Sequence, residues 1–172
     1  MKHTFLCAGA VLAISGGVAL ADNAKVCFEA EKPVSIESPL KKVTGKPGKI
    51  SGGGYLEIPW DENRTKGIGH ATYSINAPRA GTYYLWARTY WANGCGNSVK
   101  AGVGTNKDDA KLLGEDGTYD AWHWVGGRAR VTLKAGKNTF TMFNSETGVQ
   151  VDQFFLCTDP DYTPVGTRQI TK

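Results

Sequence analysis

The chain has 172 residues, of which 20 are lysine or arginine and 16 are aspartate or glutamate, giving a formal net charge of +4. Basic and acidic residues are interleaved along it, so the sequence has no arginine-rich stripe of the kind that binds nucleic acid, and we exclude that class of partner. About 150 residues follow residue 21, enough for one domain with a core that does not depend on disulfides.

The first 21 residues have the pattern of a secretory signal peptide. A short basic start, Met1-Lys2-His3, precedes an apolar stretch, and Ala19-Leu20-Ala21 supplies the small, large, small pattern that signal peptidase accepts. The rival interpretation is a retained membrane anchor, but the stretch is shorter than the roughly 20 residues of a spanning helix. No later apolar run is long enough to span a bilayer, so we expect a secreted or periplasmic protein.

The remainder of the chain has an all-β pattern. Short alternating segments recur between glycine, proline and asparagine turns, and no long window keeps apolar residues at helical spacing. We expect one β-sandwich domain over residues 22–165, followed by a tail over residues 166–172. Ala135-Gly136-Lys137 is turn chemistry that predicts a hairpin. The predicted strands are Lys25 to Glu31, Tyr55 to Ile58, His70 to Asn76, Thr82 to Trp91, Ser98 to Val103, Arg128 to Leu133, Asn138 to Phe143 and Val149 to Leu156.

Three cysteines follow the signal segment, which leaves at least one of them without a partner inside the chain. Cys27 and Cys157 lie in the first and last predicted strands, which are often neighbours in sandwiches, and we predict a disulfide between them. If Glu29 and Asp152 point to the same side, Cys157 has the opposite parity to Cys27 unless a bulge intervenes.

Three acids form a candidate cation site. Glu29 and Glu31 point to the same side of the first strand, and Asp152 is embedded in an apolar strand, where an uncompensated carboxylate costs several kcal/mol. Calcium accepts six to eight oxygens at flexible angles, so these carboxylates with backbone carbonyls would suffice. The alternative is that the two glutamates are solvated and that Asp152 pairs with a lysine or caps a turn.

A second constellation is aromatic. Trp122 and Trp124 share one side of an extended segment that follows Tyr119 and Asp120, and aromatic faces of this kind stack on the apolar faces of sugar rings. We expect Trp122 to be exposed and Trp124 to belong to the core. Other residues are candidates for the rim of the same binding site. Around the loop Gly94-Cys95-Gly96 they are Tyr90, Trp91, Asn93 and Asn97, and Trp60 begins a second polar loop that is also a candidate.

Catalytic interpretations have less support. His70 and His123 have no serine or cysteine with local nucleophile chemistry, and the cysteines and histidines are too scattered for zinc. A pair of acids acting as a glycosidase is the remaining enzymatic alternative. Another alternative is a structural protein of the envelope that meets a protein partner through Cys95 or exposed aromatic residues.

Five motifs, in order, resemble the carbohydrate-binding modules of families 6 and 35. They are Glu29-Ala30-Glu31, the segment from Gly81 to Arg88, Trp122-His123-Trp124, Leu133-Lys134-Ala135-Gly136, and the segment from Glu146 to Gln153. The resemblance implies a galactose-binding-like jelly roll that binds a polysaccharide or glycan without catalysis. It also implies a structural calcium at Glu29, Glu31 and Asp152, a sugar-binding tryptophan at Trp122, and a polar sugar ligand at Gln150, where the families commonly have asparagine.

Overall fold

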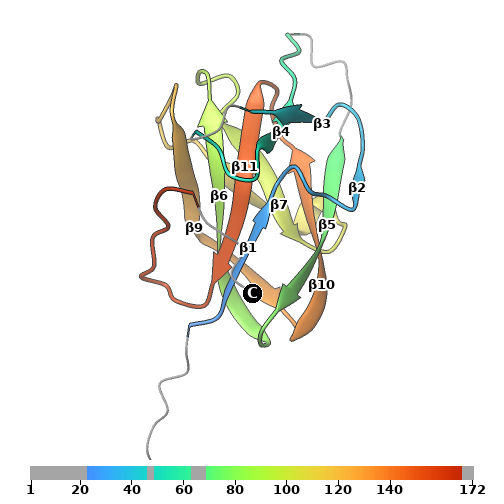
Figure 1. The fold of residues 1–172 in the computed structure, drawn as a ribbon, viewed down its shortest axis with the longest axis vertical. Coiled ribbons are helices and arrows are strands. Elements are labelled where there is room, and N and C mark those ends of the chain that lie inside the picture. Colours follow the sequence, from blue (N-terminus) through green and yellow to red (C-terminus); the bar gives the residue numbers. More distant parts are fainter. Residues whose placement is uncertain (1–22, 46–48, 63–68, 168–172) are drawn as a thin grey trace, which may run out of the picture.

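The protein is a sandwich of two antiparallel β-sheets, here in a computed structural model that describes residues 23–45, 49–62 and 69–167 (Figure 1). The predicted signal segment therefore lies outside the described residues. No helix in the described part of the chain is long and apolar enough to cross a membrane.

The first sheet has the order β3-β4-β11-β6-β9, and β1 also pairs with β11. The second sheet has the order β2-β5-β10-β7-β8, and a single 3-10 turn, η1 (Lys107–Asp109), precedes β8. The strands of the first sheet are β1 (Lys25–Glu29), β3 (Lys41–Thr44), β4 (Gly54–Ile58), β6 (Gly81–Trp91), β9 (Trp122–Leu133) and β11 (Val149–Cys157). Those of the second are β2 (Ser35–Ile36), β5 (His70–Ala77), β7 (Ser98–Val103), β8 (Lys111–Gly114) and β10 (Gly136–Asn144).

All eight predicted strands are present; β7 has the predicted ends, and the other seven are shifted at one end or both. The largest shift is in β9, which begins at Trp122 rather than at Arg128. The three strands that the sequence pattern missed, β2, β3 and β8, are two to four residues long, and most of their side chains are exposed. So few residues cannot show a clear apolar alternation.

The predicted hairpin at Ala135-Gly136 is wrong. β9 belongs to the first sheet and β10 to the second, so the turn carries the chain across the sandwich. Gly136 has a φ of 81°, which suits a tight turn of either kind. Turn residues reverse the chain, but they do not decide whether the next strand pairs with the last one.

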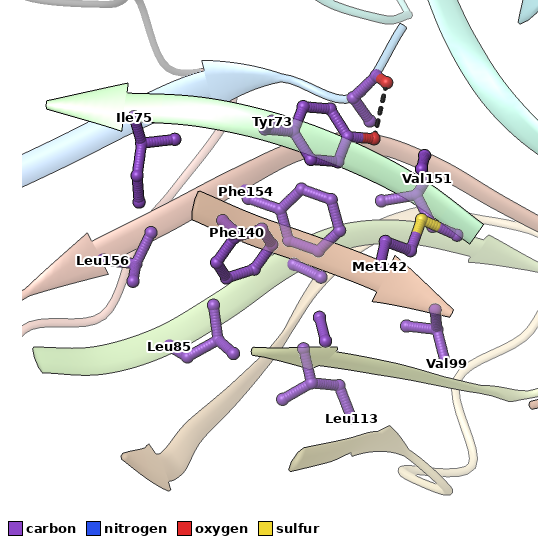
Figure 2. Packing of buried hydrophobic residues seen from close by; sticks show 14 of the residues in the cluster. Tyr73, Ile75, Leu85, Val99, Leu113, Phe140, Met142, Val151, Phe154 and Leu156 are labelled. Atoms are coloured by element: carbon purple, nitrogen blue, oxygen red, sulfur yellow. Dashed lines mark hydrogen bonds between the residues drawn. The ribbon is translucent and has the colours of Figure 1, made fainter. Parts of the chain in front are cut away.

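The core lies between the two sheets and is built from alternate residues of each strand. On β6, Tyr83, Leu85 and Ala87 face the core. Figure 2 shows the centre of this core, where the rings of Phe140 and Phe154 lie 5.0 Å apart. Most of the stability of the sandwich comes from burying such side chains.

One extra residue in β11 determines where the acids lie. The pairing of β11 with β6 is regular except between Val151 and Gln153, so Asp152 is a β-bulge. At the same point the other edge of β11 changes partner: residues 149–151 pair with β4, and residues 153–157 pair with β1. Asp152 therefore lies where the end of β1 and the start of β4 come together.

The regular register of β1 against β11 places Cys27 and Cys157 on the same outer face of the first sheet, but no disulfide joins them. The ladder pairs Cys27 with Phe155 and Cys157 with Lys25, so the two cysteines are diagonal rather than opposite. Their sulfur atoms also have different neighbours: Cys157 Sγ donates a hydrogen bond to the Asp159 carbonyl at 3.3 Å, and Gln153 Nε2 lies 3.8 Å from Cys27 Sγ. The predicted disulfide is therefore absent from this structure.

The segment after β11 turns back over this face. Tyr162 packs on Phe155 with ring centroids 5.2 Å apart, and Trp124 Nε1 donates a hydrogen bond to the Gly166 carbonyl at 2.8 Å. Residues 158–166 thereby cover an aromatic cluster at the lower half of the outer face in the view of Figure 1.

Candidate functional site

A row of polar and aromatic side chains crosses the upper part of the outer face of the first sheet. The registers pair Lys41 with Glu57, Glu57 with Gln150, Gln150 with Tyr90, and Tyr90 with Trp122. Directly paired residues of adjacent strands point to the same side. The row therefore presents an ammonium group, a carboxylate, an amide, a phenol and an indole side by side, and none of the five is buried.

Trp122 lies within this row in a defined environment. Its ring contacts Tyr90 at 5.7 Å and Tyr55 at 5.6 Å between centroids, both at steep angles. The Arg88 guanidinium carbon lies 5.4 Å from the centroid of the Trp122 ring. The indole is thus half-buried and packed on several sides, whereas the sequence predicted a freely exposed side chain.

Loops at the same end of the sandwich add further groups. Asp120 Oδ1 accepts a hydrogen bond from the Tyr90 hydroxyl at 3.2 Å, and Tyr119 is 40% exposed. The Asn97 backbone N–H donates to Glu146 Oε2 at 2.8 Å, and the Asn97 side-chain amide lies 3.4 Å from the Tyr119 hydroxyl. The structure therefore groups most of the predicted binding residues: Tyr90, Asn97, Tyr119, Asp120, Trp122 and Gln150.

The most exposed tryptophan of the described residues is Trp60, at 50%. Its ring lies over Gly148, where an added Cβ would stand 2.8 Å from the ring. The hydroxyl of Thr147, the residue before that glycine, donates a hydrogen bond to the Asp61 carbonyl at 3.3 Å. Trp60 was predicted from its loop as a candidate for the rim, and its contact with the loop between β10 and β11 brings it next to the row.

Two aromatic expectations need correction. Trp91 was predicted to bind ligand, but it is 0% exposed and belongs to the core, because it lies on the inward face of β6 in the same series as Leu85 and Ala87. Trp124 was predicted to be core. It lies instead on the outer face, packed against Phe155.

The acids form a buried cluster below the row. Glu29 Oε1 accepts hydrogen bonds from the Ser51 hydroxyl at 2.7 Å and from Gln153 Nε2 at 3.1 Å. Glu29 Oε2 and both carboxylate oxygens of Glu31 are buried without a hydrogen-bond partner among the described residues. Among the described residues, the nearest cation to Glu31 is the Lys32 ammonium at 4.0 Å, on a side chain that is mostly exposed.

Asp152 is fully buried and already compensated. Its Oδ2 pairs with Arg88 Nη1 at 2.6 Å, and its Oδ1 accepts a hydrogen bond from the Ser51 backbone N–H at 2.9 Å. Burial raises the pKa of Asp152 to about 6, although Arg88 and the Ser51 hydrogen bond oppose the rise. Arg88 is therefore buried against an internal acid.

Glu31 is the least compensated acid of the cluster. Burial, together with the nearby Glu29 and Asp152 carboxylates, raises the pKa of Glu31 to about 7, while its own backbone and Lys32 oppose the rise. Buried carboxylate oxygens without partners are costly unless a proton or a cation joins them.

These residues fit a hard cation at two carboxylates. Both glutamates reach the same side of Gly52, where an added Cβ would collide with Glu31 Oε1 and lie 3.0 Å from Glu29 Oε2. Glycine at a φ of 60° therefore keeps this space open. In the described parts of the chain, no three acidic, histidine or cysteine side chains are grouped to hold a metal, so a cation here would also need backbone or water oxygens.

The comparisons with known proteins give matches among solved structures. No protein-family model and no curated protein matches the chain. It is similar to a family 35 carbohydrate-binding module from Clostridium thermocellum, with 23% identity and a TM-score of 0.55 over 77% of this chain and 96% of that one. The C-terminal family 6 module of a marine laminarinase from Zobellia galactanivorans has 18% identity and a TM-score of 0.53 over 77% of this chain and 98% of that one.

Several matches are larger enzymes. A mannanase of Podospora anserina that carries a family 35 module has 22% identity and a TM-score of 0.59 over 85% of this chain, but the match covers only 29% of the enzyme chain. The matches to an isomalto-dextranase and a galactanase cover 23% and 29% of those chains. The chain therefore spans less than a third of each enzyme and nearly all of each single module. Its fold is that of the family 35 and family 6 carbohydrate-binding modules, as the resemblance in sequence predicted.

Proposed function

We propose that this protein is an exported, non-catalytic carbohydrate-binding protein that holds a polysaccharide or glycan on the row from Gln150 through Tyr90 to Trp122. The single observation that carries the proposal is the register, which places an amide, a phenol and an indole next to one another on one face. An indole stacks on the apolar face of a sugar ring, while the amide and the neighbouring Asp120 bond hydroxyl groups.

The loop residues extend this surface. Trp60 and Tyr119 are the exposed aromatic side chains at the same end of the sandwich, and they offer stacking positions for further sugar units of a chain. The non-catalytic assignment is supported by the matched solved structures, since those that correspond to the chain over almost their whole length are binding modules.

We further propose that Glu29 and Glu31 hold a structural calcium beside Asp152. The support is the set of three buried glutamate oxygens without partners and the raised pKa of Glu31. A divalent cation there would neutralise the uncompensated charge and tie the end of β1 to the loop before β4. It stabilises the folded protein without taking part in a reaction.

The test is binding to a panel of polysaccharides that includes mannan, laminarin, galactan, dextran, xylan and a polyuronate. We expect weak binding to at least one of them and its loss in Trp122→Ala. Trp124→Ala is the matched control, because Trp124 lies two residues along the same strand and face but under residues 158–166. Circular dichroism checks that both variants fold. Equal loss of binding in both folded variants, or no binding to any member of the panel, contradicts the proposal.

A further inference from the structure

Arg88 lies between the acid cluster and the aromatic row. Its side chain leaves β6 on the outer face, and the residue is only 8% exposed. Nη1 donates hydrogen bonds to Asp152 Oδ2 at 2.6 Å and to the Lys49 carbonyl at 3.1 Å. The same guanidinium has its central carbon 5.4 Å from the centroid of the Trp122 ring.

These contacts hold the guanidinium in one place. Asp152 is 0% exposed, lies in a bulge, and is fixed by the Ser51 backbone N–H. The Lys49 carbonyl comes from a different segment of the chain, so acceptors from two separate segments hold Nη1 of the guanidinium. A planar guanidinium that is fixed and partly desolvated is a good surface for an aromatic ring.

The consequence for Trp122 is a defined orientation. Arg88 lies against the indole, while Tyr55 and Tyr90 contact it with interplanar angles of 64° and 54°. Tyr55 meets the indole in a T-shaped contact and Tyr90 is tilted against it, so neither phenol ring is stacked parallel to the indole. The half-buried indole, in contact with these three side chains, has little room to change its orientation.

We infer that Arg88 is a positioning residue for Trp122: anchored on Asp152, it supports the indole from one side and fixes the ring surface that a sugar stacks on. The inference deepens the proposed function, because it specifies how that same site is held in shape. A side chain fixed before binding loses less conformational entropy when the ligand arrives, so positioning increases affinity without a further contact to the sugar.

The test uses Arg88→Lys, which keeps a positive charge beside Asp152 but removes the planar fork. Arg79→Lys is the matched control: Arg79 bonds Thr158 from the turn between β5 and β6, at the opposite end of the sheet from Trp122. Both are studied at a constant calcium concentration, so that the acid cluster stays in one state.

The first arm needs no sugar. A double-mutant cycle of Arg88→Lys and Trp122→Leu in urea unfolding measures the coupling of the two side chains, which should change the unfolding equilibrium constant by about 2- to 30-fold, the range of a cation–π contact. The signal of the Trp122 indole N–H is identified by its absence in Trp122→Leu. Its heteronuclear NOE, which falls as the ring becomes more mobile, should fall in Arg88→Lys and not in Arg79→Lys. Additive effects and an unchanged NOE overturn the inference.

The second arm uses the polysaccharide that binds best. Arg88→Lys should weaken binding by about 2- to 30-fold, and Arg79→Lys should leave it unchanged. If Arg88→Lys keeps full affinity although its Trp122 indole has become mobile, the position of the ring does not determine binding, and the inference is overturned. If Trp122→Ala keeps full affinity, the proposed glycan site is wrong, and the first arm still decides whether Arg88 positions the indole.

Discussion

Replacing Glu31 with glutamine should stabilise the protein when no divalent cation is present. The pKa of Glu31 is raised from 4.5 to about 7, so the folded protein binds a proton that the unfolded chain has lost. Between these values the unfolding free energy falls as pH rises, and the stabilisation present below pH 4.5 is gone above pH 7. At pH 8 the ionised carboxylate is a net cost, and Glu31→Gln removes it.

The size of the effect follows from the same shift. About 1.4 kcal/mol per pKa unit corresponds to about 3 kcal/mol for ionising this carboxylate. The side chain is 11% exposed and Lys32 is 4.0 Å away, so solvent and a neighbouring cation screen part of that cost. We therefore expect Glu31→Gln to raise the unfolding free energy by about 2 kcal/mol at pH 8 and by much less at pH 5.

Urea unfolding with a chelator at both pH values measures this directly. Glu57→Gln is the control, because Glu57 pairs with the exposed Lys41 at 2.9 Å and its loss should cost at most about 1 kcal/mol. With excess calcium the order should reverse, since wild type gains a ligand-dependent stabilisation that the variant lacks. A Glu31→Gln protein that is less stable than wild type at pH 8 in chelator would refute the reasoning.

Two further predictions concern the glycines beside the acids and the cysteines. Gly52→Ala and Gly53→Ala both place a side chain at positive φ, 60° and 84°, but only the first reaches the acids, so calorimetry should show the calcium-induced rise in Tm lost in Gly52→Ala and kept in Gly53→Ala. Equal responses would place the ion elsewhere. A thiol reagent should modify the exposed Cys95 in the folded protein and Cys157 only on unfolding, because burial both blocks Cys157 and raises the pKa of its thiol. A peptide linking Cys27 to Cys157, found by mass spectrometry without reduction, would contradict the structure.

The strands with strong alternation could be predicted from the sequence, and those without it could not. On β6, Tyr83, Leu85 and Ala87 alternate with Tyr84, Trp86 and Arg88, and the two series do face opposite sides of the sheet. β2 has two residues, and no periodicity exists over two residues. Which strands pair with each other could not be predicted from the sequence either, because the turn at Ala135-Gly136 suits a hairpin as well as a crossing between sheets.

The candidate site was predictable by residue type more than by geometry. Trp122, Tyr90 and Gln150 were selected from separate segments, and the register shows them to be neighbours. Trp91 was selected because it lies next to the glycine-rich loop, although alternation along β6 places it on the same face as Leu85 and Ala87. Asp152 pairs with Arg88, which is 64 positions away in the chain, and no local sequence pattern predicts a contact between residues so far apart.

The bulge in β11 has a consequence for how this architecture can change. Val151 faces the core and Gln153 faces outward, so a strand that passed directly from one to the other would alternate normally, and Thr89 and Arg88 of β6 would still be their partners. Asp152 is thus a single inserted residue whose deletion would leave every other side chain of β11 on its present face. The fold therefore does not depend on the buried acid. A lineage with this fold can gain or lose the acid by inserting or deleting one residue, while the other side chains of β11 keep their faces.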